Sequence, residues 1–406
     1  MLSVAEARAR ILARLVSTEA EPVLLDGCAG RVLAQDLVAN TDLPLFDNSA
    51  MDGFALRAGD TDRGGEPPAL RVVGDIRAGD APSFALAPGE ACRIMTGAPL
   101  PKGADAVIPV EDTDIGIRAP GATAPASVTP RRSVRRGDFV RGRGQDVKQG
   151  QTVFQRGHRL RAQDAGLLAM LGMSRIAVHG IPRIALISSG DELVEPSVPL
   201  PPGMIRDSNT YMLGALVESA GARAQAFGIA RDAPGAMEDL LAQAVGAGVH
   251  LIVSSAGVSV GAFDFVRSAV VANGSLDFWK VNMRPGKPLA FGENGGVPFI
   301  GLPGNPVSAF VGFEVFVRPA IDRLAGLPDV PRQRVRVVAA ESIESDGRES
   351  YLRAVVKQEG DTLMAHLTGH QGSGNLLSLV QANALLIVPA GVECVPANRE
   401  LDAWIL

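Results

Sequence analysis

The sequence predicts a multidomain protein in which a central α/β domain is combined with two smaller β-rich regions. Residues 183–325 alternate strand-like and helix-like segments, residues 51–140 contain short strands with frequent turns, and residues 329–406 return to a period of two. The chain has 406 residues, and at roughly 150 residues per domain this length suggests two to four domains. The 46 glycines and 28 prolines fit short elements joined by tight turns.

The first third of the chain is expected to begin with a helix and continue in short strands. Apolar residues at helical spacing predict a helix over residues 3–16, and Val32–Val38 is strand-like. Strand-like runs follow at Gly53–Leu56, Leu70–Val73, Ala91–Met95 and Ala106–Val110. A helix-like run over Ala162–Leu171 should end at Gly172, because glycine readily adopts the left-handed conformation that closes many helices.

The central region has the alternation typical of a parallel sheet covered by helices. Its expected strands are Ile184–Ser188, Ala224–Ile229, Leu251–Ser254, Phe278–Val281, Leu289–Phe291 and Phe299–Leu302. The expected helices are Ser208–Ser219, Gly235–Val245, Phe263–Ala272 and Pro306–Leu324, with Asn305 as the N-cap of the last one. Four period-two strands after Pro328 predict a small C-terminal β-domain or barrel, and they lie at 335–338, 351–356, 385–388 and 401–405.

Charge and composition exclude several classes of protein. The formal net charge is −5, from 39 basic and 44 acidic residues, so there is no dominant basic field for a general nucleic-acid binder. No segment offers the about 18 uninterrupted apolar residues that a membrane span needs, and the N-terminus lacks the apolar core of a signal peptide. Cys28, Cys92 and Cys394 form neither a disulfide framework nor a metal motif. We expect a cytoplasmic protein.

Polar loops follow nearly every strand of the central region. In an open parallel sheet such loops meet at the carboxyl ends of the strands, where α/β proteins bind their ligands. Glu192, Asp232 and Asp264 each follow a strand or begin a helix, and three carboxylates at one rim repel one another unless a cation or proton intervenes. They are candidate Mg²⁺ ligands. Alternatively, each is a turn residue or an acid that complements a helix dipole.

Two further loops are suited to anions. The segment from Ser255 through Gly257 and Ser259 to Gly261 joins a strand to a helix, and its backbone amides could bind a phosphate, although it matches neither common nucleotide motif. The alternative is a merely tight turn. Lys280, Arg284 and Lys287 lie within eight residues and could hold an oxyanion, unless they form a solvated basic turn.

The loop before the last central helix contains two prolines, Pro303 and Pro306, whose fixed φ angles make it stiff. Stiffness favours a preformed site, although the same residues also make a good helix start. Polar turns at Asn48–Gly53 and Met95–Ala98 in the first β-rich region do not by themselves indicate a functional site.

Taken together, the motifs are specific. They run in order through the chain as Phe46–Gly53, Arg93–Ala98, Arg143–Asp146, Ser189–Leu193, Gly257–Gly261, Pro285–Pro288, Gly301–Ser308 and Gly369–Ser373. In this combination the chain resembles the MoeA family of molybdopterin molybdenumtransferases, which is related to the E domain of gephyrin.

The resemblance implies a central doubly wound α/β domain of the molybdopterin-binding type, an inserted β-rich domain and a C-terminal barrel-like domain. It divides the chain into an elongated domain I (1–46 and 141–178), domain II (47–140), domain III (179–328) and domain IV (329–406). It also implies a homodimer whose site lies between subunits. Transient contacts with a molybdopterin adenylyltransferase and with proteins of molybdoenzyme maturation are expected, and nucleic-acid and membrane partners are not.

The reaction implied by the resemblance is insertion of molybdenum from molybdate into adenylylated molybdopterin, with Mg²⁺-dependent release of AMP. Carried over by motif, the catalytic residues would be Asp52, Thr96, Asp146, Glu192, Asp232 and Asp264, and the metal ligands Asp232, Asp264 and Glu192. The substrate-binding residues would be Ser255, Gly257, Ser259, Gly261, Lys280, Arg284, Lys287, Pro303, Pro306, Arg353 and Ser373.

Two other functions remain open from the sequence. A molybdopterin adenylyltransferase would share the α/β fold, and a non-catalytic scaffold would fit the gephyrin relationship. The chain departs from common family residues at Ala256, Arg284 and Thr210. None of these departures removes a proposed carboxylate.

Overall fold

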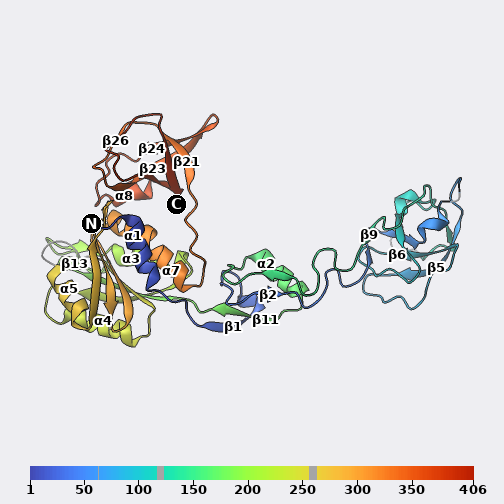
Figure 1. Cartoon of the computed structure of the whole chain (residues 1–406), viewed down its shortest axis with the longest axis horizontal. Coiled ribbons are helices and arrows are strands. Elements are labelled where there is room, and N and C mark those ends of the chain that lie inside the picture. Colours follow the sequence, from blue (N-terminus) through green and yellow to red (C-terminus); the bar gives the residue numbers. More distant parts are fainter. Residues whose placement is uncertain (63, 117–122, 256–262) are drawn as a thin grey trace. The chain divides into compact units, whose positions relative to one another are not determined.

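The computed structural model describes the chain except residues 63, 117–122 and 256–262, and the side chains of residues 263–265 (Figure 1). The described chain forms two compact units. The first comprises Met1–Ala34, Gly157–Arg161 and Arg175–Leu406, and the second comprises Gln35–Arg156 and Ala162–Ser174. The predicted domain I is thus divided between the units, and the four-domain scheme stays a prediction.

The second unit contains the predicted β-rich domain. A five-stranded sheet has the order β7-β4-β6-β5-β8, with β4 (Gly53–Leu56), β5 (Leu70–Ile76), β6 (Glu90–Ile94), β7 (Ala106–Pro109) and β8 (Ser127–Val128). Its two faces bury separate clusters, because side chains alternate along each strand: Phe54 and Leu56 face one side and Ala55 the other. The unit is completed by β2 (Leu37–Val38), β3 (Asn48–Ser49), β9 (Val140–Arg141), β10 (Thr152–Phe154) and α2 (Ala162–Met170).

The first unit is built around a six-stranded sheet of order β15-β12-β16-β20-β19-β17. The strands are β12 (Arg183–Ser189), β15 (Arg223–Ala230), β16 (Leu251–Ser255), β17 (Gly274–Lys280), β19 (Pro288–Asn294) and β20 (Val297–Leu302). The first four in the order are parallel, β19 pairs antiparallel with β20, and the edge strand β17 pairs antiparallel with β19. This confirms the predicted α/β domain and places the carboxyl ends of four strands at one rim.

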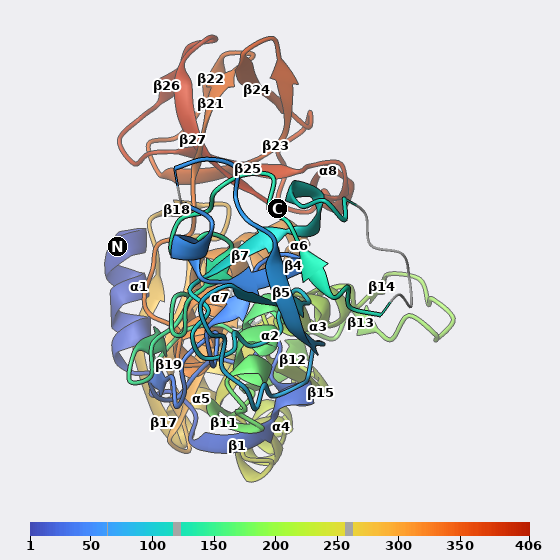
Figure 2. The ribbon, with the colours of Figure 1, turned by 90° about the vertical axis from the view of Figure 1, so that its right-hand side faces the viewer.

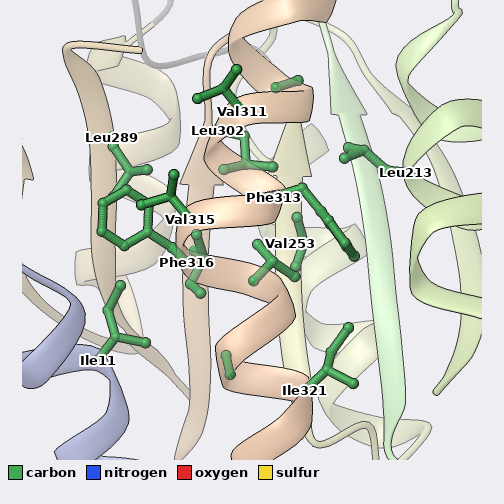
Figure 3. Packing of buried hydrophobic residues seen from close by; sticks show 14 of the residues in the cluster. Ile11, Leu213, Val253, Leu289, Leu302, Val311, Phe313, Val315, Phe316 and Ile321 are labelled. Atoms are coloured by element: carbon green, nitrogen blue, oxygen red, sulfur yellow. The ribbon is translucent and has the colours of Figure 1, made fainter. Parts of the chain in front are cut away.

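Helices cover both faces of this sheet, as a doubly wound fold requires. One face packs against α1 (Val4–Ala13), α3 (Asn209–Ser219), α6 (Pro306–Gly312) and α7 (Arg318–Leu324), and the other against α4 (Ala236–Gly246) and α5 (Phe263–Ala272). Leu251 and Val253 of β16 belong to the first face and Ile252 to the second. Figure 3 shows Val253, Phe313 and Phe316 in the larger core.

The predicted long helix over 306–324 is present but contains a π turn. Residues Phe313–Val317 form that turn between α6 and α7. Pro319 has no N–H to donate four residues back, so regular α-helical bonding cannot continue there. The buried Glu314 accepts hydrogen bonds from Arg318 at 2.8 and 2.9 Å and pairs with Arg332, which compensates its charge.

The C-terminal strands close into a barrel, as predicted. Strands β23 (Glu349–Glu359), β24 (Thr362–Leu367), β21 (Val335–Ala339), β27 (Glu400–Ile405) and β25 (Ala384–Val388) pair in that order, and β25 pairs back with β23. Figure 2 shows these strands gathered apart from the central sheet. Short β18 (Met283–Arg284) pairs with the start of β23, so the barrel adjoins the loop of Arg284 and Lys287.

The remaining elements of the first unit are short. They are β1 (Ala20–Leu24), β11 (Arg175–His179), β13 (Leu193–Val194), β14 (Ile205–Arg206), β22 (Ile343–Glu344), β26 (Cys394–Val395) and α8 (Leu376–Val380). The sequence did not predict β11 or β24, and both pair antiparallel with a partner, β1 and β23 respectively. Among the described residues, no helix has the length and apolar character to cross a membrane.

We predict that Phe316→Ala destabilises the first unit by about 3–5 kcal/mol, because the ring is 1% exposed and its removal leaves a cavity in the main core. Urea unfolding monitored by circular dichroism measures the change. Val271→Ala on α5, where the side chain is 50% exposed, serves as the control and should shift stability by less than about 0.5 kcal/mol. Equal effects of the two substitutions would contradict this view of the core.

Candidate functional site

The rim of the central sheet gathers the polar ends of its parallel strands. β12 ends at Ser188–Ser189 and leads to Asp191 and Glu192, while β15 leads to Asp232. β16 ends at Ser255, and β20 leads to the turn that contains Pro303. These positions follow from parallel pairing, which sets all four strand ends on the same side.

Three carboxylates lie together at one end of this rim. The backbone N–H of Asp232 donates to Asp191 Oδ1 at 3.1 Å, which joins the loops after β15 and β12. Arg231 Nη1 fastens the same loops, since it lies 3.0 Å from the Asp191 carbonyl oxygen and 3.1 Å from that of Leu193. Gly190 has a φ of +142°, and a Cβ there would lie 2.4 Å from the Glu192 carboxylate. Glycine therefore lets Glu192 fold back over the loop.

The electrostatics of this acidic group suit a cation. Partial burial raises the pKa of Asp232, and the neighbouring charges of Asp191 and Glu192 raise it further. Within the described residues, no group of three or more His, Cys, Asp or Glu side chains has an arrangement that could hold a metal ion. The third predicted ligand, Asp264, lies in the first turn of α5, and its side chain lies outside the described residues. The donor set of Glu192 and Asp232 consists of carboxylate oxygens, which fits a hard ion such as Mg²⁺.

Ser255 lies in a chain of hydroxyl groups. Its Oγ is 3.0 Å from Ser188 Oγ, which is 2.9 Å from Thr210 Oγ1 on α3. Thr210 in turn donates to the buried Asp207 at 2.6 Å. Ser255 is among the residues predicted from the sequence to bind substrate, whereas Ser188 and Asp207 are not.

A cationic cavity of about 380 Å³ lies at the other end of the rim. It is lined by five of the predicted substrate-binding residues: Arg284, Lys287, Pro303, Arg353 and Ser373. The structure adds Arg348, Asn305, Ser308 and Gln371. The lining residues include four cationic side chains and no carboxylate. Arg348 is already paired with Asp346, and the other three cations suit the cavity to an anion.

Arg353 is unusual because its side chain is 0% exposed and has no acidic partner among the described residues. It donates from Nε to Ser378 Oγ at 3.1 Å and from Nη2 to the Gly372 carbonyl at 3.0 Å. Burial lowers its pKa, and the charge of Arg284 lowers it further. A buried guanidinium held next to a second cation lacks a counter-charge, which a bound oxyanion would supply.

The Pro303–Pro306 loop is fixed to the C-terminal barrel domain. Asn305 donates from Nδ2 to Ser373 Oγ at 2.8 Å, and the Val307 N–H donates to the Ser373 carbonyl at 3.1 Å. Asn305 precedes α6 as predicted, but its side chain makes no capping bond because it reaches Ser373 instead. Pro306 begins α6. Lys280 is exposed at the end of β17, and Pro288, which pairs with it on β19, lines the cavity.

The remaining predicted residues lie in the second unit. Thr96 donates from its backbone N–H at 2.8 Å and from its hydroxyl at 2.7 Å to Asp52 Oδ1, so this predicted pair is in contact. Asp146 instead accepts from Arg141 Nη2 at 2.7 Å, and both side chains are about half exposed. Asp52 and Asp146 are not joined by any described hydrogen bond.

Part of the predicted site lies outside the described residues. The segment 256–262 contains Gly257, Ser259 and Gly261, together with the Ala256 departure. The phosphate-binding prediction for that loop therefore stays a prediction, as does the role of Asp264.

Comparison with known proteins covers nearly the whole chain. The family model of the MoeA N-terminal region (domain I and II) matches residues 2–172, that of a probable molybdopterin binding domain matches 185–323, and that of the MoeA C-terminal region (domain IV) matches 336–406. Molybdopterin molybdenumtransferase 2 of Mycobacterium tuberculosis is 40% identical over 394 residues, which cover 95% of this chain and 94% of the relative. The molybdopterin molybdenumtransferase of Nostoc is 36% identical over 94% of this chain and 88% of its own length.

A solved structure agrees. The crystal structure of the molybdopterin biosynthesis protein MoeA from Pyrococcus horikosii has a TM-score of 0.84 and 30% identity, and it covers 100% of this chain and 99% of its own. The resemblance inferred from the motifs is confirmed: this chain belongs to the MoeA family of molybdopterin molybdenumtransferases.

Proposed function

We propose that this protein is a molybdenum insertase of molybdenum cofactor biosynthesis. It takes adenylylated molybdopterin and molybdate, releases AMP and places molybdenum at the dithiolene of the pterin. The observation that carries the proposal is the cationic cavity with the buried Arg353 at its wall, for which the described residues provide no acidic partner. Membership in the family and the relatives named molybdopterin molybdenumtransferase support it.

The cavity suits an oxyanion for electrostatic reasons. Arg284 presents a planar guanidinium and Lys287 a compact ammonium, and the buried guanidinium of Arg353 adds positive charge at the wall. Ser373 adds a hydroxyl, although that hydroxyl already accepts from Asn305. Both the barrel and the α/β domain contribute lining residues, so molybdate would be held by groups that folding has already fixed, at little reorganisation cost on binding.

The acidic group would serve adenylate release. Glu192 and Asp232, together with Asp264, would hold Mg²⁺, which supplies charge neutralisation at the phosphates when bound. Attack of water on the adenylate phosphorus forms one P–O bond and breaks the bond to the bridging oxygen, which yields AMP and molybdopterin phosphate. Glu192 can orient that water, since its carboxylate is exposed at the rim. No covalent nucleophile is needed.

The site is proposed to be shared between two copies of the chain. In a homodimer, the Asp52–Thr96 pair of one subunit would serve the rim of the other, and Asp146 would support that region. This accounts for site-like motifs in the second unit that lie far in sequence from the loops of the rim. Contacts with the adenylyltransferase that supplies the substrate, and with maturation proteins that receive the product, are expected to be transient.

The direct test is incubation of the purified protein with adenylylated molybdopterin, molybdate and Mg²⁺, with AMP measured by chromatography. We expect AMP release that stops when Mg²⁺ is chelated. An adenylyltransferase would instead convert molybdopterin and Mg-ATP to the adenylylated form. Rapid adenylylation without molybdate-dependent AMP release would replace this proposal, and absence of both activities would favour a scaffold.

We predict that Lys287→Met weakens molybdate binding at least about ten-fold, because it removes one charge-assisted contact from a partly enclosed cavity. Isothermal titration calorimetry with sodium molybdate measures the dissociation constant. Lys357→Met, which removes an exposed lysine from β23, is the matched control and should bind as the parent does. Loss of affinity in both variants would indicate a general charge effect and contradict the assignment.

We predict that Asp232→Asn raises the thermal midpoint at neutral pH and abolishes the further rise that Mg²⁺ produces in the parent. Since the folded-state pKa of Asp232 is raised above 3.8, ionising it costs stability when the pH exceeds that raised value. Below the ordinary pKa the carboxyl is protonated whether folded or unfolded, so the advantage of asparagine should vanish as the pH falls toward about 4. Differential scanning fluorimetry across pH, with and without MgCl₂, measures both effects.

The control for this prediction is Asp361→Asn, in an exposed turn of the barrel, which should leave the response to Mg²⁺ unchanged. A midpoint of Asp232→Asn that still rises with Mg²⁺ would remove Asp232 from the metal ligands. A midpoint below that of the parent at neutral pH would show that the carboxylates do not repel one another.

We predict that mixing Asp52→Asn with Lys287→Met restores part of the AMP release that each variant lacks at a molybdate concentration well below the dissociation constant of Lys287→Met. Asp52→Asn disables the contribution of the second unit and Lys287→Met that of the first, so a heterodimer keeps one intact composite site. Random pairing of equal amounts gives about a quarter of the parental sites. AMP release after joint unfolding and refolding is the measurement, and activity that stays at the level of the separate variants would place each site within one chain.

A further inference from the structure

The first turn of α3 is connected to three strand ends of the rim. Thr210 reaches Ser188 at the end of β12 and, through it, Ser255 at the end of β16. Asn209 donates from Nδ2 to the Gly304 carbonyl at 2.7 Å, in the turn after β20. Two residues in the first turn of one helix thus join the three loops that the proposed site uses.

The hydroxyl groups continue an apolar face of the sheet. Along β12 and β16, Ile184, Leu186, Leu251 and Val253 belong to the core beneath α3, and Ser188 and Ser255 follow them at the same alternation. Ser188 is 0% and Ser255 2% exposed. Buried hydroxyl groups need partners, and here they satisfy one another.

Asp207 determines which hydroxyl donates and which accepts in each hydrogen bond from Thr210 to Ser255. Its carboxylate is 3% exposed and, when ionised, only accepts hydrogen bonds. Thr210 donates to it twice, from the backbone N–H at 3.1 Å and from the hydroxyl at 2.6 Å. With its proton committed to Asp207, Thr210 Oγ1 must accept from Ser188, and Ser188 Oγ must then accept from Ser255.

This donor–acceptor order fixes what Ser255 can offer. Its proton points to Ser188, so its oxygen has only lone pairs left for other groups. Asn209 presents the same character, because its Nδ2 is used by Gly304 while its buried Oδ1 has no donor in the described part of the chain. Two acceptors that have no further donor among the described residues therefore lie beside the start of α3.

We propose that Asp207 and Thr210 are positioning residues that hold Ser255 as a hydrogen-bond acceptor for an N–H donor of the ligand. The recognised chemistry is the donor edge of a nitrogen heterocycle, with Asn209 Oδ1 as a second acceptor. This inference rests on the proposed function, in which the heterocycle is the pterin and the cationic cavity takes the oxyanion. The hydrogen bond from Asn209 to the Gly304 carbonyl links these acceptors to the Pro303–Pro306 loop, which lines the cationic cavity.

The test compares binding of molybdopterin with binding of molybdate in three variants of the full chain. Thr210→Val removes the hydroxyl while nearly keeping the shape of the side chain. Ser188→Ala interrupts the row of hydrogen bonds without changing any residue of α3. Thr210→Ser keeps the hydroxyl. We expect the first two to raise the dissociation constant of molybdopterin on the order of ten-fold, and Thr210→Ser to stay within about three-fold of the parent. Molybdate binding should stay within about two-fold in all three, which a general loss of structure would not allow.

Asp207→Asn provides a second readout. An amide can donate to Thr210 Oγ1, which reverses the donor–acceptor order of the hydrogen bonds and leaves Ser255 as a donor. This should weaken molybdopterin binding without changing the fold. Parental molybdopterin affinity in Thr210→Val and Ser188→Ala overturns the inference, as does an equal loss of molybdate affinity. If Thr210→Val does not fold, Ser188→Ala decides. A parent chain that binds molybdate but no molybdopterin defeats the proposed function, and this inference with it.

Discussion

Parallel pairing of β15, β12, β16 and β20 is the constraint on which the rest of the first unit depends. It brings four strand ends to one rim although they are up to about a hundred residues apart in sequence. Apolar side chains on both faces of these strands secure the pairing, because helices bury them on each side. A register shift of one residue in β16 would turn Ser255 away from α3 and place Ser254 there.

This rim separates charge by sign. The loops after β15 and β12 bring carboxylates together, and the loops near β20 and the barrel bring cations together. Each group of like charges destabilises the fold when no ligand is bound, since like charges repel and Arg353 is buried with no acidic partner in the described part of the chain. A ligand that combines an oxyanion with a metal-bound phosphate would relieve both costs. The same charged groups that would bind the ligand would therefore also stabilise the charges of the proposed reaction.

Much of this arrangement could be predicted from sequence because it depends on local pattern. Strand periodicity and the loops that follow each strand identified Glu192, Asp232 and Lys287. The role of Asn305 could be predicted only in part, since a helix start is a local property while its bond to Ser373 depends on how the barrel packs. Arg348 and the Ser188–Thr210 contact join distant segments in the same way, and no periodicity reports such contacts.

The measurement that tests the central claim most directly is a crystal structure with molybdate and Mn²⁺, in which anomalous scattering locates each metal. The account predicts a molybdenum peak within contact distance of Arg284, Lys287 and Arg353, and a manganese peak at Glu192 and Asp232. A molybdenum peak elsewhere on the protein, or a manganese ion that contacts neither carboxylate, would contradict it.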